Sequence, residues 1–273
     1  MNIQQLIQQS SLDRIDVEVL LCHVLQRSRE YLFAHADEGL TERQQIQFTE
    51  LVARREQGEP IAYLVGHKEF WSLDFCVTPD VLIPRPETEL IVETVLQHYP
   101  YEKMIKLVDL GTGSGAIALA IGSERPNWQL TAVDKSAAAL NLAKKNAAAL
   151  AITNVELIES DWCDKLTGQY DVVVSNPPYI DQADPHLQQG DVQFEPNMAL
   201  VAEKNGLQAI MVIAEQAKTY LKPQGLLVFE HGYQQATEVQ NILQRKGYQH
   251  IKTLKDLNGN HRVTLATIKT QLF

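Results

Sequence analysis

The sequence has few cysteines and no long apolar run. Its 273 residues include three cysteines, which lie far apart and form no CxxC pair, so neither a disulfide framework nor a zinc site is expected. No uncharged apolar run approaches the roughly 18 residues that a membrane-spanning helix requires. The first residues also lack the basic and then apolar pattern of an export signal. We therefore expect a cytoplasmic protein that does not bind a membrane.

The chain also lacks an excess of positive charge. Lys and Arg number 24 against 34 Asp and Glu, which gives a formal net charge of −10. A chain this acidic lacks the general attraction to nucleic acid that basic proteins show, so direct DNA binding is not expected. None of its eight histidines falls in a metal-binding spacing such as HExxH, and no Ser or Cys lies at a nucleophile elbow. We therefore expect no metal site and no covalent mechanism.

The first 70 residues or so have helical spacing. Apolar side chains recur at steps of three and four residues, as Ile15, Val19 and Leu20 illustrate. Thr41, followed three residues later by Gln44, has the form of a capping box, which predicts a helix over 42–56. Helices this short need partners, so we expect a small helical bundle.

From residue 63 to 86 the pattern changes to aromatic and β-branched residues broken by turn formers, which predicts a β-hairpin between two domains. Beyond it, β-rich runs alternate with helical stretches, which indicates an α/β fold around a mostly parallel sheet. The last two strands have no helix between them and are expected to pair antiparallel at the sheet edge. The expected strands are 105–110, 129–133, 155–158, 171–175, 226–229, 248–254 and 262–268, and the expected helices are 116–123, 136–150, 206–221 and 234–246.

A glycine-rich loop follows the first of these strands and opens a helix. It runs from Gly111 through Thr112, Gly113 and Ser114 to Gly115. Glycines permit a tight turn and the close approach of a ligand, and the helix N-terminus offers free amide donors. A plain structural turn is the competing interpretation, and the strand, helix and acid that surround the loop favour a nucleotide site instead.

Two acids help to identify the nucleotide. Asp134, 19 residues beyond Gly115, ends the second strand where a ribose diol would lie. The spacing Gly-x-Gly-x-x-Ala also fits a dinucleotide site, so the loop alone does not separate NAD from S-adenosylmethionine. Asp109, two residues before the first glycine, would repel a pyrophosphate and suit the amino group or sulfonium of S-adenosylmethionine. The pattern therefore resembles the nucleotide loop of Rossmann-like methyltransferases.

A second motif follows the strand expected at 171–175. Asn176, Pro177, Pro178 and Tyr179 stand at the carboxyl end of that strand, where open α/β sheets carry their sites. The side-chain oxygen of Asn176 and the backbone oxygen of Pro177 can each accept a hydrogen bond from an incoming NH₂ group. The prolines stiffen the loop, and the ring of Tyr179 offers a flat face to a planar amide or base. A rigid turn is the structural alternative.

The two motifs predict methyl transfer to an NH₂ group, with Asn176, Pro177 and Tyr179 as catalytic residues. A conjugated NH₂ group is a poor nucleophile because its lone pair is delocalised. Two acceptors favour a pyramidal nitrogen whose lone pair can face the methyl carbon. No general base is needed before the attack, since the alignment of nitrogen, carbon and sulfur lowers most of the barrier.

The chain resembles one family over nearly its whole length. The segment Ile83–Glu89, with the sequence Ile-Pro-Arg-Pro-Glu-Thr-Glu, is similar to the signature of the HemK/PrmC family, the peptide chain release factor N5-glutamine methyltransferases. Segments 13–25, 54–63 and 194–196 are similar to that family as well. The resemblance implies S-adenosylmethionine-dependent methylation of the glutamine side-chain amide in the GGQ motif of bacterial class 1 release factors.

The resemblance also implies a fold and a set of site residues. It implies a helical substrate-recognition domain over 1–69, a β-hairpin linker over 70–86 and a Rossmann-like class I methyltransferase domain over 87–273. We expect a monomer. Trp162, beside Asp161, would stack on the adenine while the acid accepts from its amine. The implied cofactor-binding residues are Gly111, Thr112, Gly113, Ser114, Gly115, Asp134, Trp162 and Asn176, and the implied glutamine-binding residues are Asn176, Pro177, Pro178 and Tyr179.

Two alternatives and several residues stay open at this point. An adenine N6-methyltransferase acting on DNA or RNA could hold an exocyclic base amine with the same four-residue motif. A noncatalytic protein that only binds S-adenosylmethionine would have no need of Asn176. Arg85, Glu87 and Glu89 either shape the pocket or belong to an exposed linker. The stretch 202–207 departs from the family pattern and is expected to be a surface turn.

Overall fold

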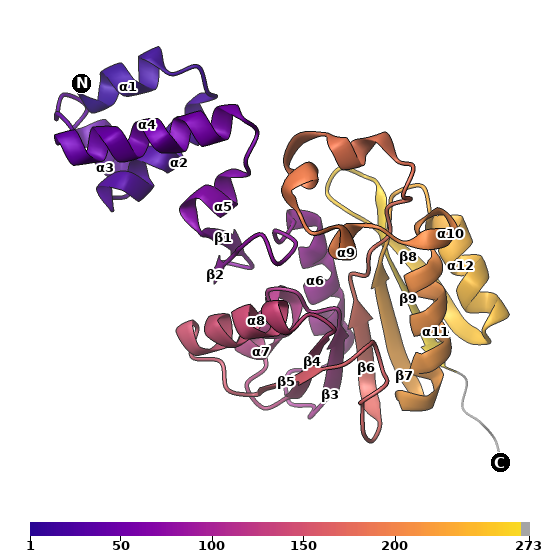
Figure 1. Cartoon of the computed structure of the whole chain (residues 1–273). Helices are drawn as coiled ribbons and strands as arrows, with labels where there is room; N and C mark the ends of the chain where they lie inside the picture. Colours follow the sequence, from indigo (N-terminus) through magenta and orange to yellow (C-terminus); the bar gives the residue numbers. More distant parts are fainter. Residues whose placement is uncertain (269–273) are drawn as a thin grey trace. The chain divides into compact units, whose positions relative to one another are not determined.

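The computed structural model describes residues 1–268 and divides them into two compact units (Figure 1). One unit, here called the helical unit, consists of Met1–His67 together with Gln188–Phe194. The other, here called the catalytic unit, consists of Lys68–Leu187 and the chain from Glu195 onward. The short segment 188–194 therefore belongs to the helical unit although it lies in the middle of the catalytic sequence.

The helical unit is built from short helices around one apolar core. Val17, Leu20 and Leu21 of α2 are fully buried and pack with Phe48 and Leu51 of α4. The capping box of α4 is confirmed, because Thr41 and Gln44 each accept the other's backbone N–H. The helices are α1 (Ile3–Gln9), α2 (Arg14–Leu25), α3 (Arg29–Ala34), α4 (Glu42–Glu56) and α5 (Ile61–Val65).

The β-hairpin is shorter than the segment 70–86 and begins earlier. Its strands are β1 (His67–Phe70) and β2 (Leu73–Cys76), and Trp71 and Ser72 between them both have positive φ. Two successive positive φ values match the twist of a two-residue hairpin turn. Residues 77–86 form no strand, because the three prolines among them lack the N–H that strand pairing requires.

The catalytic unit contains a seven-stranded sheet with the order β5-β4-β3-β6-β7-β9-β8. Neighbours from β5 to β7 pair parallel, whereas β9 pairs antiparallel with both β7 and β8. The predicted α/β fold and its antiparallel edge are thus confirmed. The strands are β3 (Lys106–Leu110), β4 (Gln129–Asp134), β5 (Val155–Glu159), β6 (Tyr170–Ser175), β7 (Leu221–Glu230), β8 (Tyr248–Lys255) and β9 (His261–Ile268).

Helices cover both faces of this sheet (Figure 1). On one face α6 (Glu89–His98) and α7 (Ala116–Glu124) pack on the strands, with the end of α8 (Ala137–Ala149) beside them. On the other face α11 (Gln208–Tyr220) and α12 (Ala236–Arg245) enclose a second apolar core. The central strands β3 and β6 are buried on both faces, which explains their continuous apolar runs, whereas β5 and β8 are partly exposed. Short helical segments complete the unit: η1 (Pro86–Thr88), η2 (Pro185–Gln188), α9 (Asn197–Leu200) and α10 (Glu203–Gly206). The last residue of η2 and all of η3 (Gly190–Phe194) belong to the helical unit.

The largest difference from the sequence prediction is the start of β7. We expected a strand over 226–229, but β7 begins at Leu221 and includes Pro223 and Gly225. Gln224 has a φ of 62°, and the register with β6 shifts between Tyr170 and Val172. The start of the strand is therefore irregular, and its proline and glycine are residues that a strand pattern does not predict.

Among residues 1–268, no helix is both long and apolar enough to cross a membrane.

Candidate active site

One cavity of the catalytic unit lies at the carboxyl ends of the central strands. Since β4, β3 and β6 are neighbours in the sheet, the loops that follow them meet at one edge. Residues 111–114 of the glycine loop line this cavity together with Asp134, Trp162 and Asn176, whereas the predicted Gly115 is not among its lining residues. The structure thus brings together, in one place, residues from the two sequence motifs and from the expected adenine pocket.

The glycine loop turns sharply onto the end of β4. The backbone N–H groups of Gly111 and Thr112 both donate to the carbonyl oxygen of Val133, at 2.8 and 2.9 Å. Gly111 has a φ of 75°, and a Cβ there would lie 3.3 Å from the indole of Trp162. The absence of a side chain at Gly111 therefore leaves room for this indole beside the backbone of the loop.

Asp134 lies at the tip of β4 and is already hydrogen-bonded. Its Oδ2 accepts from the backbone N–H of Gly113 and its Oδ1 from that of Ser136, each at 2.9 Å. These two bonds fix the orientation of the carboxylate. A carboxylate has about four acceptor sites, so two hydroxyl groups of a ribose can still donate to it.

Asp109 does not lie where we expected it. Its side chain is fully buried beneath the glycine loop, where Oδ2 accepts from Thr112 Oγ1 at 2.6 Å and Oδ1 has no hydrogen-bond partner within the described part of the chain. Burial raises the pKa of this carboxyl to about 7. Asp109 therefore holds the loop through Thr112 rather than facing a cationic ligand directly.

Trp162 forms one wall of the cavity. It follows β5 with a φ of 48°, which turns the chain sharply and places the indole against Gly111. Asp161 also lines the cavity, and its carboxylate forms an ion pair with Lys135 at 2.6 Å. Indole and carboxylate together suit a planar base that carries an amino group.

The Asn-Pro-Pro-Tyr motif follows β6, and its side chains point to different surroundings. Asn176 and Pro178 line the cavity, whereas Pro177 is buried. Tyr179 donates its hydroxyl hydrogen to Glu230 Oε1 at 3.2 Å, and burial raises its pKa. The hydroxyl of Tyr179 is thus used inside the protein, while Asn176 is the polar side chain of the motif that faces the cavity.

Two residues that the sequence analysis missed support this motif. Asn176 Nδ2 donates to Thr88 Oγ1 at 3.2 Å, and Thr88 Oγ1 donates to Glu230 Oε2 at 2.7 Å. Glu230 ends β7, the neighbour of β6, so the rule that located Asp134 at a strand end could have identified it. Thr88 had no such signal, because 88 residues separate it from Asn176.

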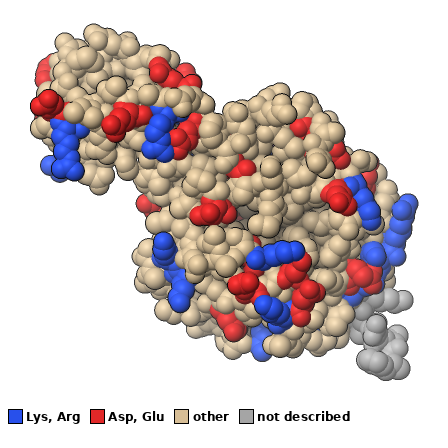
Figure 2. Space-filling view, in the orientation of Figure 1, with Lys and Arg blue, Asp and Glu red and all other residues tan. Residues whose placement is uncertain are grey.

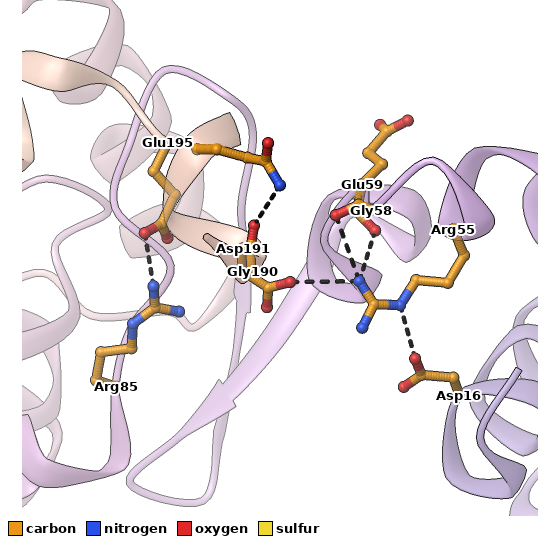
Figure 3. A network of polar contacts seen from close by, with 9 residues as sticks. Asp16, Arg55, Gly58, Glu59, Arg85, Gly190, Asp191 and Glu195 are labelled. Carbon is orange, nitrogen blue, oxygen red and sulfur yellow. Dashed lines mark hydrogen bonds and ion pairs between the residues drawn. The ribbon is translucent and has the colours of Figure 1, made fainter. Parts of the chain in front are cut away.

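The segment with the family signature connects the rim of the cavity to the rest of the unit. Glu195, whose side chain is fully buried, accepts from the backbone N–H of Ile83 at 3.0 Å. It also accepts from Arg85 Nη2 at 2.6 Å (Figure 3). Glu89 accepts from the backbone N–H of Trp71 at 2.7 Å. Arg85 and Glu89 therefore fasten the rim and the hairpin, so they do not form an exposed linker.

The stretch 202–207 is not a simple surface turn. Gly206 is buried with a φ of 78°, and a Cβ there would lie 1.9 Å from the carbonyl oxygen of Tyr179. Gln235 Nε2 donates to that same carbonyl oxygen at 3.0 Å. Any side chain at position 206 would push the Tyr179 backbone away, so this glycine is required by the close packing behind the motif.

The segment 188–194 is held within the helical unit by Arg55. Arg55 Nε lies 2.6 Å from Asp16 Oδ2, and Arg55 Nη1 lies 3.3 Å from Asp191 Oδ1 (Figure 3). Nη1 also donates to the carbonyl oxygen of Glu59 at 3.1 Å. A planar guanidinium with several donors suits such a junction better than a lysine would.

The surface charge gives no sign of a nucleic-acid track in the view of Figure 2. Lys and Arg stand interspersed with Asp and Glu among the described residues of this face. A protein that follows a phosphate backbone needs its cations gathered along one path. Residues 1–268 contain no group of three or more His, Cys, Asp or Glu placed to hold a metal ion.

Two family descriptions match the chain. Residues 86–195 match the methyltransferase small domain, and residues 2–66 match the PrmC N-terminal domain. Curated relatives named release factor glutamine methyltransferase align with nearly the whole chain. The protein from Salmonella typhimurium is 50% identical, over 92% of this chain and 91% of its own length. The proteins from Escherichia coli and Coxiella burnetii are 48% and 47% identical, over 95% and 96% of this chain and 94% and 95% of their own lengths.

Solved structures share the fold. A methyltransferase from Pyrococcus furiosus superposes with a TM-score of 0.56 at 20% identity, covering 81% of this chain and 99% of that one. A 16S rRNA methyltransferase from Thermus thermophilus, solved with AdoMet and guanosine, gives a TM-score of 0.55 at 18% identity, covering 74% and 50%. With identities near 50% to curated relatives over more than nine tenths of its length, the chain belongs to the release factor glutamine methyltransferase family.

Proposed function

We propose that this protein transfers a methyl group from S-adenosylmethionine to a glutamine side-chain amide of a peptide chain release factor. The relatives' name supports the substrate class. The observation that carries the proposal is that the glycine loop and Asn176 line one cavity. The GGQ glutamine of bacterial class 1 release factors is the target that the family resemblance implies.

The residues around the cavity fit S-adenosylmethionine. The glycine loop lines the cavity, Asp134 offers carboxylate lone pairs, and Trp162 presents an indole. The cofactor supplies an activated methyl group bound to a sulfonium. Gly111 to Gly115 and Asp134 would hold its amino acid and ribose portions, and Trp162 and Asp161 its adenine.

The motif after β6 would hold the glutamine amide. The side-chain oxygen of Asn176 and the backbone oxygen of Pro177 are the acceptors for its two N–H groups, which favours a pyramidal nitrogen. Pro178 contributes an apolar wall, and Tyr179 stabilises the loop through its bond to Glu230. The chain then has to orient two groups rather than remove a proton before the attack, and orientation alone lowers a barrier substantially.

The division of labour along the chain is part of the proposal. We propose that residues 1–69 recognise the release factor, that 70–86 link the domains and that 87–273 carry methyl transfer. The division into a helical and a catalytic unit after His67 supports this proposal, apart from the segment 188–194. We further propose that the protein acts as a monomer in the cytoplasm, where its substrate takes part in translation.

The test uses the full chain with S-adenosylmethionine, a purified class 1 release factor and a DNA duplex in one mixture. Mass mapping should find one additional methyl group on the GGQ glutamine and none on the DNA. Asn176→Ala should lower the rate by about a thousandfold, because an oriented acceptor is lost at the reacting group.

The matched control is Asn258→Ala, which changes an exposed asparagine in the turn between β8 and β9. We expect its rate to equal that of the unchanged protein. Methylated adenine in the duplex would support the nucleic-acid alternative. Binding of S-adenosylmethionine without any product would support a noncatalytic protein, and full activity of Asn176→Ala would reject the amide clamp.

A further inference from the structure

A chain of hydrogen bonds runs from the cavity to the buried end of β7. Asn176 Nδ2 donates to Thr88 Oγ1 at 3.2 Å, and Thr88 Oγ1 donates to Glu230 Oε2 at 2.7 Å. Tyr179 donates to the other oxygen of Glu230 at 3.2 Å. Thr88 and Glu230 are 5% and 1% exposed, so water does not compete for these bonds. These hydrogen bonds therefore connect Asn176, which lines the cavity, to the buried carboxylate of Glu230.

The direction of these bonds is fixed by what each group can do. Above its pKa Glu230 is ionised and can only accept, so it draws the hydroxyl hydrogens of both Thr88 and Tyr179 toward itself. Thr88 Oγ1 then has only lone pairs left to offer. The end of the Asn176 amide that meets it must donate, so this end is the NH₂ group. The amide oxygen is left to face the cavity.

We propose that Glu230 and Thr88 are positioning residues that set the orientation of the Asn176 side-chain amide, so that its oxygen meets the NH₂ group to be methylated. This inference rests on the proposed function. A reversed amide would present an NH₂ group to the substrate NH₂ group, and two donors repel each other. The same carboxylate also fixes the Tyr179 hydroxyl, so one buried charge orders both ends of the motif.

The surroundings of Glu230 make its charge sensitive to pH. Burial raises its pKa to about 7, while the hydrogen bond from Thr88, the charge of Arg262 and the hydrogen bond from Tyr179 oppose that shift and Glu87 adds to it. A protonated Glu230 can donate to Thr88 Oγ1, and the Thr88 hydroxyl can then donate to Asn176. Acidification would thus reverse the direction of these hydrogen bonds and, with it, the orientation of the Asn176 side-chain amide.

The first experiment compares Thr88→Val, Thr88→Ser and the unchanged protein on a purified release factor. Thr88→Val keeps the shape of the side chain and removes the hydroxyl, so kcat should fall by about a hundredfold. KM for the release factor and the dissociation constant of S-adenosylhomocysteine should stay within about twofold, because neither depends on the Asn176 amide alone. Thr88→Ser keeps the hydroxyl and should restore kcat to within about threefold of the unchanged protein.

The order of these two variants separates positioning from packing. If Thr88 only filled space, the valine variant would be the better one, because valine keeps the methyl group that serine lacks. Thr94→Val is the matched control, since Thr94 is also buried and, among residues 1–268, its hydroxyl donates only to the backbone oxygen of Leu90 in its own helix. Its kcat should equal that of the unchanged protein.

A second readout needs no turnover. The side-chain NH₂ signals of Asn176, assigned in ¹⁵N spectra by their loss in Asn176→Ala, should shift in Thr88→Val and not in Thr94→Val. Glu230→Gln has no ionisable group at this position, so the decline of kcat below about pH 7 that we expect for the unchanged protein should disappear.

The outcomes distinguish this inference from the proposed function. If the unchanged protein does not methylate the release factor, the proposed function fails. If it does, and Thr88→Val keeps full kcat or surpasses Thr88→Ser, the positioning role is overturned. An unchanged pH profile in Glu230→Gln, or unmoved Asn176 signals in Thr88→Val, would overturn it as well. Should Thr88→Val fail to fold, Glu230→Gln still tests the pH profile.

Discussion

Two buried glutamates, one in each unit, differ in the partners that hold them. Glu18 in α2 and Glu230 at the end of β7 are each 1% exposed. Glu18 accepts from Arg14 and Arg29, at 2.7 and 2.6 Å, and these hydrogen bonds lower its pKa despite burial. Glu230 accepts from two hydroxyl groups, and burial raises its pKa to about 7.

The difference shows what each carboxylate contributes. A guanidinium pair compensates the buried charge, so Glu18 can fasten α2 to the start of α3. Hydroxyl groups compensate less, so Glu230 remains costly to ionise and instead orders the neutral donors around it. Asp109 beneath the glycine loop is a second acid of this kind, since its hydrogen-bonding side-chain partner is Thr112. A buried carboxylate held by hydroxyls at the edge of a cavity is therefore a marker of a functional site.

We expect Asp109→Asn to change the free energy of unfolding more than Glu18→Gln or Glu215→Gln does. The pKa of Asp109 is raised to about 7, so its contribution to stability is full below about pH 4 and is lost as the pH rises toward 7. Asparagine does not ionise and avoids that loss. We expect the variant to be more stable by about 2 kcal/mol at about pH 8, and the gain to vanish near pH 4.

Urea unfolding followed by tryptophan fluorescence measures this effect, because Trp71, Trp128 and Trp162 all lie in the catalytic unit. The change of the difference with pH is the decisive quantity. A difference that stays constant between about pH 4 and 8 would mean that Asp109 is ionised in the folded protein at every pH tested.

Glu18→Gln should change the free energy of unfolding in the opposite direction, by lowering it. The pKa of Glu18 is lowered, so its contribution is present above the ordinary value and is lost as the pH falls through the lowered one. The arginine side chains are about two thirds exposed, at 65% and 60%, so solvent screens the pair. We expect a loss of about 1 kcal/mol near pH 7 that disappears in acid.

Hydrogen exchange of the α2 amides, read by mass spectrometry, measures this loss, since the helical unit contains no tryptophan between residues 1 and 67 or 188 and 194. Faster exchange in α2 at neutral pH, and equal exchange once the pH lies below the lowered pKa of Glu18, is the expected result. Equal exchange at both pH values would show that the arginines add nothing to stability.

The smallest effect is expected for Glu215→Gln. Hydrogen bonds from Lys218 and Lys246 lower the pKa of Glu215 to about 2, yet all three side chains reach solvent. Exposed ion pairs contribute little. We expect the urea midpoint of the catalytic unit to stay unchanged, both in low salt and at high ionic strength. A clear shift would mean that burial is not what separates the strong pairs from the weak ones.

Local patterns in the sequence predicted most of the fold and part of the site. The alternation of apolar strands and helices predicted the parallel sheet, and the capping box located α4 at its observed bounds. Asp134 and Asn176 could be found because Asp134 ends a strand and Asn176 directly follows one, and strand ends gather at one edge of a parallel sheet. These signals lie within a few residues of the feature they identify.

The parts that escaped prediction depend on residues far apart in the chain. Thr88 meets Glu230 across 142 residues, and Glu195 meets Arg85 across 110. Gly206 is needed only because the Tyr179 backbone passes beside it. No local pattern encodes such contacts, since they arise when the sheet and its loops are assembled. The role of the segment Ile83–Glu89 is visible only in the folded protein, where Arg85, Thr88 and Glu89 each bind a different partner.

The segment 188–194 makes the two units inseparable by a single cut. The chain passes from the helical unit to the catalytic unit after His67, returns at Gln188 and leaves again after Phe194. A fragment that starts at Lys68 would keep Asp191 and Phe194 but lose Arg55 and Gly58, which lie against them. Each half expressed alone would therefore lack residues that lie against its own surface. The full chain is therefore the smallest piece to express.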